Sequence, residues 1–191
     1  MTLRVAGVRL DAQETDSDGD NEKPRLIVLT DIGGGDTDDE QTLVRLLVYA
    51  NEFDIEGLVA GSNLGHGGDF STNEAVMLDV LDQYALVRDN LALHAEGFPM
   101  AQELYDVVHV GQPVASPELD PMDSIGDDKD TAASDWIIEV VDREDDRPVN
   151  FVAWGGTADL AQAIWRVAND RSDAELEAFL NKIRVYAVAD Q

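Results

Sequence analysis

The feature that most constrains this chain is the stretch of residues 25–51, in which a strand pattern passes into a helix pattern through an acidic, glycine-rich loop. The stretch begins with the apolar run Leu26-Ile27-Val28-Leu29 and ends with apolar residues at helical spacing. In an open parallel α/β sheet, ligands bind beyond the carboxyl ends of the strands. We therefore expect a binding site at the loop, whose carboxylates and glycines are Asp31, Gly33, Gly34, Gly35, Asp36, Asp38 and Asp39.

Four carboxylates this close in sequence repel one another, and they stay ionised together only where water or a cation screens them. A helix N-terminus stabilises one or two of them and does not account for four. Oxygen ligands with no Cys or His nearby favour a hard cation, Ca²⁺ or Mg²⁺. The alternative is an Asp-rich cap and turn in an acidic protein, and the spacing alone does not separate the two. A phosphate site is disfavoured, because the loop has no P-loop lysine and aspartates repel phosphate.

The sequence LIVLTDIGGGDTDDEQTLVRLLVYANEFDIEGLVA, residues 26–60, resembles a known family. Its pattern of a strand, Thr-Asp, a glycine loop, Asp-Asp and an amphipathic helix is similar to the N-terminal signature of nucleoside hydrolases. It resembles still more closely the nucleoside hydrolase-like domain of bacterial cellulose-binding proteins. The segment between Asp31 and the Asp38-Asp39 pair is longer than in nucleoside hydrolases, and one residue longer than in the closer family. Which of Asp36, Asp38 and Asp39 matches each family aspartate is therefore left open.

A second family hallmark resembles residues 148–167, where an apolar strand is followed by Gly155-Gly156 and a helix pattern. In nucleoside hydrolases a backbone carbonyl at the end of this strand ligates Ca²⁺, and the equivalent carbonyl here belongs to Trp154. The resemblance thus implies a Ca²⁺ site formed by Asp31, Asp39 and the Trp154 backbone carbonyl. The alternative for the two glycines is a turn that starts the helix without any ligand.

The resemblance also implies how the site would act. Asp31 would accept a proton from a water molecule that attacks a ribosyl group, while Asp38 and Asn63 would hold sugar hydroxyls. Asp36 is a further candidate for substrate binding. Asn63 lies in the glycine-rich loop of residues 61–68, where an Asn chosen for turn geometry is the alternative. The acidic run of residues 126–131 is interpreted as a helix N-cap, with a second metal site as the less favoured reading.

The composition is strongly acidic, and this excludes several classes of partner. The chain has 40 Asp and Glu against 13 Lys and Arg, a net charge of −27, with an ordinary apolar content of 44%. Such a charge argues against binding to nucleic acid or to anionic membranes, and it is typical of a protein from a high-salt cytoplasm. The sequence has no Cys, no apolar run long enough to span a bilayer and no signal-peptide pattern. A cytoplasmic location is the expectation.

Strand patterns near residues 26, 55, 91, 149 and 184 alternate with helix patterns, including 70–84, 101–109, 132–141 and 172–183. We expect Ser172 to cap the last of these helices, with Glu175 three residues on. This order predicts an α/β fold, with a Rossmann-like, mostly parallel sheet and helices on both faces. Residues 1–23 are interpreted as an extension and acidic linker, and 24–191 as the nucleoside hydrolase-like domain. The related families continue for roughly another hundred residues, so the domain is expected to be incomplete at its C-terminus. A missing C-terminal half or a homo-oligomer would complete it.

The leading hypothesis is a nucleoside hydrolase-like N-glycosidase domain that hydrolyses an N-ribosyl or related bond with a Ca²⁺-activated water. Its ligand would be a small-molecule nucleoside or carbohydrate. The alternative is a non-catalytic carbohydrate-binding or interaction module on the same scaffold, because fold resemblance does not settle activity. A nucleotide-binding Rossmann protein is disfavoured, because no G-x-G-x-x-G follows the first strand.

Overall fold

The computed structural model describes residues 22–33, 37–61, 70–112 and 124–188. The N-terminal extension and nearly all of the acidic linker lie outside the described residues. In chain order, the helices and strands are β1 Arg25–Thr30, α1 Asp38–Val48, the 3₁₀ helix η1 Ala50–Glu52, β2 Asp54–Ala60, α2 Phe70–Leu91, α3 Ala101–Tyr105, β3 Val108–Val110, α4 Ala132–Asp142, β4 Val149–Ala153, α5 Ala158–Asp170, α6 Asp173–Asn181 and β5 Ile183–Ala187.

Within the described residues, the strands form one parallel sheet in the order β3-β2-β1-β4-β5. The central strand β1 pairs with β2 on one side and with β4 on the other, so that Leu29 lies between Val59 and Ala153. Every residue of β1 is buried. Its near-continuous apolar sequence is what a parallel strand covered on both faces requires.

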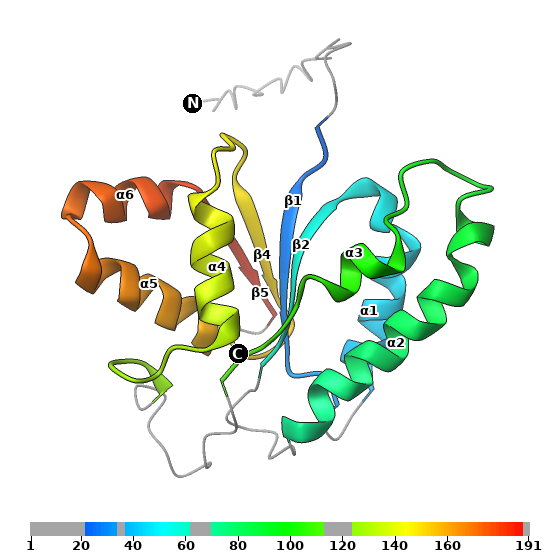
Figure 1. Cartoon of the computed structure of the whole chain (residues 1–191), viewed down its shortest axis with the longest axis horizontal. Coiled ribbons are helices and arrows are strands. Elements are labelled where there is room, and N and C mark those ends of the chain that lie inside the picture. Colours follow the sequence, from blue (N-terminus) through cyan, green and yellow to red (C-terminus); the bar gives the residue numbers. More distant parts are fainter. Residues whose placement is uncertain (1–21, 34–36, 62–69, 113–123, 189–191) are drawn as a thin grey trace, which may run out of the picture.

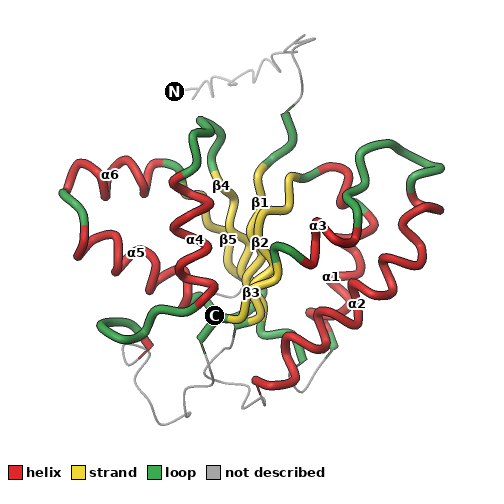
Figure 2. Tube along the Cα trace, viewed as in Figure 1, coloured by secondary structure: helices red, strands yellow, loops and turns green. Residues whose placement is uncertain are grey.

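Helices cover both faces of the sheet, as Figures 1 and 2 show, and the predicted α/β fold class is confirmed. The side chains of β1 alternate between two hydrophobic cores, as the two-residue period of a strand demands. Ile27 and Leu29 pack with residues of α4, α5 and α6 on one face. Leu26 and Val28 pack with residues of α1, α2 and α3 on the other.

The third strand of the sheet is not the one that the sequence predicted. The predicted strand at 91–93 is the end of α2 and the turn after it, in which the Ala92 N–H donates to the Arg88 carbonyl and Leu93 is 83% exposed. The predicted helix 101–109 stops at Tyr105, and β3 pairs with β2 from Val108 onward. Three valines at 107, 108 and 110 favour an extended backbone, and an edge position on β2 is available to them.

The predicted helix starts in the second half of the chain are confirmed. Ser172 caps α6, because its hydroxyl accepts from the Glu175 N–H while the Glu175 carboxylate accepts from the Ser172 N–H. Thr131 caps α4 by accepting from the Ser134 N–H. In the described residues, no helix has both the length and the apolar composition that a bilayer crossing requires.

A charged network holds the amino ends of the strands together. Arg25 is completely buried, and its guanidinium donates to both carboxylate oxygens of Glu56, at 3.0 and 2.8 Å, and to the Val140 carbonyl at 2.7 Å. Arg147 donates to Asp54 and Asp145, and this hydrogen bonding lowers the pKa of Asp145 to about 2. The network links β1, β2, α4 and the turn before β4, at the end of the sheet opposite to the predicted site.

We predict that Arg25→Ala destabilises the protein by about 3 kcal/mol, because it leaves the largely buried Glu56 carboxylate without its main partner. Urea unfolding in molar KCl measures the change. The matched control is Arg171→Ala, which removes an equally direct but more exposed ion pair with Asp142 and should cost less than about 1 kcal/mol. Equal losses in the two variants would contradict the role given to Arg25.

Candidate functional site

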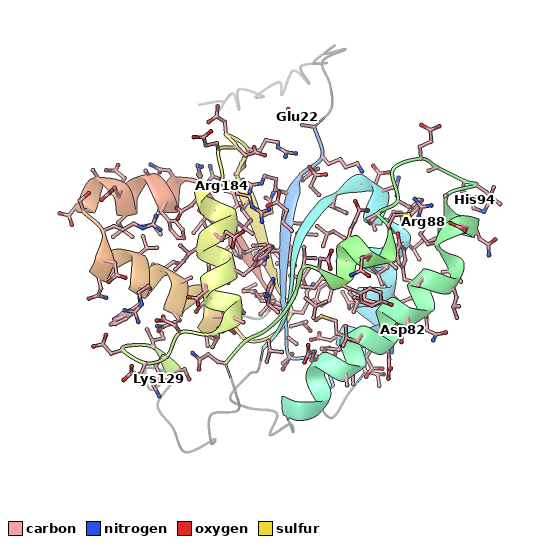
Figure 3. The ribbon with its side chains drawn as sticks, viewed as in Figure 1. Glu22, Asp82, Arg88, His94, Lys129 and Arg184 are labelled. Carbon is pink, nitrogen blue, oxygen red and sulfur yellow. The ribbon has the colours of Figure 1, made fainter. Side chains whose placement is uncertain are left out.

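The site lies where the strand order changes direction. From β1 the chain proceeds through β2 to β3 on one side, and then returns to β4 and β5 on the other. The carboxyl ends of β1 and β4 therefore flank the crevice in which open α/β sheets bind ligands. Lys129 lies at this end of the molecule and Glu22 at the opposite end (Figure 3).

The segments that follow β1 and β4 meet in this crevice. Asp31 comes directly after β1, and its carboxylate lies so close to Gly155 that any Cβ at position 155 would overlap it. The Trp154 N–H donates to the Leu29 carbonyl at 2.9 Å, which keeps the end of β4 beside β1. Gly155 is thus required by the close approach of Asp31. The predicted role of the Trp154 carbonyl as a metal ligand stays a prediction.

The first turn of α1 brings a second carboxylate to Asp31. Asp39 is only 9% exposed, and the Thr30 hydroxyl donates a hydrogen bond to its Oδ2. The same hydroxyl accepts from the Ile32 N–H at 3.0 Å, so Thr30 fixes both the turn after β1 and the position of Asp39. The carboxyl groups of Asp31 and Asp39 are hydrogen-bonded to each other. The structure therefore joins two of the three predicted metal ligands directly.

Burial and like charge raise the pKa of Asp39. Desolvation is the largest effect, and together with the neighbouring Asp31 and Asp38 it raises the pKa of Asp39 to about 7, against the lowering effect of the Thr30 hydrogen bond. Two carboxylates that share a buried position cannot both stay ionised unless positive charge lies between them. Positive charge beside Asp39 relieves this repulsion.

These residues fit a hard divalent cation. A cation beside Asp31 and Asp39 would offset the repulsion between the two carboxylates, and carboxylate oxygens are the ligands that Ca²⁺ prefers. No group of three or more His, Asp or Glu side chains suited to a metal occurs among residues 22–33, 37–61, 70–112 and 124–188. The remaining ligands would therefore include main-chain oxygens, such as the Trp154 carbonyl, and water.

The other predicted site residues are placed only in part. Asp38 is exposed at the start of α1, and its Oδ1 accepts from the Asp39 N–H at 3.0 Å. Asp36 and Asn63 lie outside the described residues. Their assignment to substrate binding stays a prediction.

A further buried carboxylate, which the sequence did not single out, stands at the same end of the sheet. Asp159 is 1% exposed, accepts from the Gln112 N–H at 2.9 Å and accepts from the Thr131 hydroxyl at 2.6 Å. Its carboxylate leaves no room for a Cβ at Gly111 and lies near Gly61. Burial raises its pKa, while the Thr131 and Gln112 hydrogen bonds oppose the rise. Asp159 thus ties the starts of α4 and α5 to the ends of β2 and β3, and the glycines after both strands were the available signal.

The acidic run of residues 126–131 is held by α5. Asp130 accepts from Arg166 at 2.5 and 3.1 Å and from the Gln162 side-chain amide at 2.7 Å. The Gln162 amide also exchanges two hydrogen bonds with the main chain of Gly126. With Thr131 as the cap of α4, these contacts account for the run as an anchored helix start, which is the favoured sequence interpretation.

We predict that Asp39→Asn makes the stability of the calcium-free protein less sensitive to a rise in pH from about 4 to about 7. The folded-state pKa of Asp39 lies above its unfolded value of about 3.9, so the folded state binds more protons in between, and its stability falls as pH rises from about 4 to about 7. Asparagine removes this titration while keeping an oxygen that can accept from Thr30.

Urea unfolding between pH 5 and 8, with a chelator in molar KCl, tests this. At pH 8 the Asp39→Asn variant should be at least as stable as the wild type. Asp89→Asn, whose side chain is 93% exposed on α2, should follow the wild type. A pH profile of Asp39→Asn parallel to that of the wild type would contradict the raised pKa.

Comparison with known proteins supports the resemblance seen in the sequence. Residues 25–191 match the family described as "Cellulose-binding Sde182, nucleoside hydrolase-like domain". Among solved structures, the chain is similar to a nucleoside hydrolase-related hypothetical protein from Saccharophagus degradans that is associated with carbohydrate metabolism, with 40% identity and a TM-score of 0.80. The similarity covers 89% of this chain but 39% of that one, so the chain spans well under half of that relative's length. No curated protein matches the sequence.

The family match covers nearly all of the sheet and its helices, from the first residue of β1 onward. The structural similarity supports the same assignment, because its identity is well above the level at which only the fold is shared. The chain therefore belongs to the nucleoside hydrolase-like domain family of cellulose-binding Sde182 proteins.

Proposed function

We propose that this domain binds Ca²⁺ between Asp31 and Asp39 and hydrolyses an N-ribosyl or related glycosidic bond. The observation that carries the proposal is the meeting of these two carboxyl groups at the point where the strand order reverses, with Asp31 lying against a glycine that leaves room for it. A raised pKa caused by burial and a specific charged neighbour is typical of functional sites.

Each residue would have a distinct part in the reaction. Bound calcium would supply the positive charge that lowers the pKa of a nearby water molecule. Asp31 would accept the proton of that water as it attacks the anomeric carbon. Asp38 would hold sugar hydroxyls together with Asn63, with Asp36 as a further candidate. The negative charge of the aspartates would also stabilise the positive charge that develops on the sugar ring.

A second candidate is a carbohydrate-binding module that does not turn over its ligand. The family description names cellulose binding, and the relative from Saccharophagus degradans is associated with carbohydrate metabolism. The described residues contain two converging carboxylates and no third side-chain ligand, which also suits a site that binds without catalysis. The ligand would again be a small carbohydrate. The two candidates differ in whether calcium and Asp31 are needed for a chemical step.

We predict that the wild-type protein binds Ca²⁺ and that Asp39→Ala weakens binding at least about tenfold, because calcium affinity follows the number of charged ligands. Calorimetry in molar KCl gives the affinity, and circular dichroism confirms that each variant is folded. Asp89→Ala is the control, because its exposed carboxylate on α2 is not part of the site. A folded wild-type protein that binds no calcium would overturn the proposed hydrolase.

We predict that Asp31→Asn lowers kcat/KM for nucleoside hydrolysis by about 10²–10⁴, the usual loss when a positioned base is removed. Release of base or ribose from a panel of nucleosides and N-ribosides measures the activity. The carbohydrate-binding candidate predicts a different result. In that case the wild type binds cello-oligosaccharides in calorimetry but releases no product from any substrate, with or without calcium.

A further inference from the structure

The loop between β4 and α5 runs across the carboxyl ends of β1, β2 and β3. Gly155 lies against Asp31, directly after β1. Asp159, in the first turn of α5, lies with its carboxylate against Gly61 and Gly111, which follow β2 and β3. A Cβ at position 111 would overlap this carboxylate. Residues 155–159 therefore connect the strand end that carries Asp31 to the ends of the two neighbouring strands.

The Asp159 carboxylate fastens the α5 end of this loop. It accepts from the Gln112 N–H at 2.9 Å and from the Thr131 hydroxyl at 2.6 Å, so it joins α5 to the end of β3 and to the start of α4. Thr157, the residue before α5, forms no side-chain cap hydrogen bond within the described part of the chain. Asp159 is therefore the contact in the first turn of α5 that fixes where this helix starts.

A carboxylate at this position carries an energetic cost. Asp159 is 1% exposed, and burial raises its pKa against the effect of the Thr131 and Gln112 hydrogen bonds. In the part of the chain that the structure describes, Asp159 forms no ion pair. A buried charge without a partner of opposite sign destabilises a protein, and such costs concentrate where function needs a defined geometry.

A second set of contacts leads from Asp159 to the other carboxylate of the site. Gly61, which lies against Asp159, donates its N–H to the Thr30 carbonyl at 2.9 Å. The Thr30 hydroxyl in turn donates to Asp39 and accepts from the Ile32 N–H at 3.0 Å. Asp159 thus supports both halves of the carboxyl pair, one through the β4–α5 loop and the other through the end of β2.

We propose that Asp159 is a positioning residue for the site at Asp31 and Asp39. It holds Gly155 against Asp31 and holds the end of β2 against Thr30, and it acts through these neighbours without touching the ligand. The inference rests on the proposed function only in taking calcium as the ligand of the site. The competing explanation is that Asp159 stabilises the fold and has no effect on the site.

The structure offers a matched control on the same helix. Gln162 is 0% exposed, exchanges two hydrogen bonds with the main chain of Gly126 and donates to Asp130. Gln162→Ala therefore removes equally buried hydrogen bonds from α5 without touching the strand ends. Asp159→Asn keeps an oxygen that can accept from Gln112 and Thr131, whereas Asp159→Ala removes it. Asp159→Ser, too short to reach both donors, replaces Asp159→Ala where that variant does not fold.

Calorimetry in molar KCl measures the calcium affinity of the full chain of 191 residues and of its variants. Asp159→Ala should weaken calcium binding at least about tenfold, the usual loss when a residue that holds a metal ligand in place is removed. Asp159→Asn and Gln162→Ala should stay within about twofold of the wild type. Urea unfolding compares the stability of the two Ala variants. Equal losses of calcium affinity in Asp159→Ala and Gln162→Ala overturn the proposal.

A second measurement needs no calcium. The Ile32 N–H donates to the Thr30 hydroxyl, so its hydrogen exchange reports on the turn that carries Asp31. With a chelator present, NMR should show Ile32 exchange at least about tenfold faster in Asp159→Ala than in Gln162→Ala. A wild type that binds no calcium overturns the proposed function, and Ile32 exchange then decides this inference by itself. Equal exchange rates in the two Ala variants overturn it.

Discussion

The parallel pairing of β1 with β2 on one edge and β4 on the other is the constraint on which the rest of the structure depends. It buries every residue of β1 and divides the protein into two hydrophobic cores, one on each face of the sheet. It also places the loop after β1 beside the loop after β4, although more than a hundred residues separate them in the chain. The candidate site is a consequence of this pairing, because neither loop alone brings Asp31 against Gly155.

The two ends of the sheet differ in how their charged side chains are paired. At the amino end, Arg25 and Arg147 are matched by Glu56, Asp54 and Asp145, so each buried charge has a partner of opposite sign. At the carboxyl end, Asp31 and Asp39 bring two carboxyl groups together, and burial raises the pKa of Asp39. Matched charges hold a fold together, whereas two like charges kept in contact create a place for a proton or a cation.

The site is supported by a second set of contacts that carry no predicted chemistry. Asp159 links α4 and α5 to the glycines after β2 and β3, and Gln162 holds the main chain of Gly126. These contacts fix the framework around the crevice through buried hydrogen bonds, which are strong where water is excluded.

The sequence by itself determined the central strand, the helix that follows it and the family, because each of these follows from a local sequence pattern. The apolar run of β1, the aspartate and glycine loop, the amphipathic α1 and the Ser172 cap of α6 all depend on residues within a few positions of one another. The tertiary structure decided that β3 forms at Val108 and not at Leu91. The valine-rich segment at Val108 pairs with the edge of β2, whereas Leu91 is the last residue of the long helix α2. It also decided that Asp39 meets Asp31 and that Asp159 is buried. Burial and the approach of distant loops depend on the packing of the whole sheet and not on any single stretch of the chain.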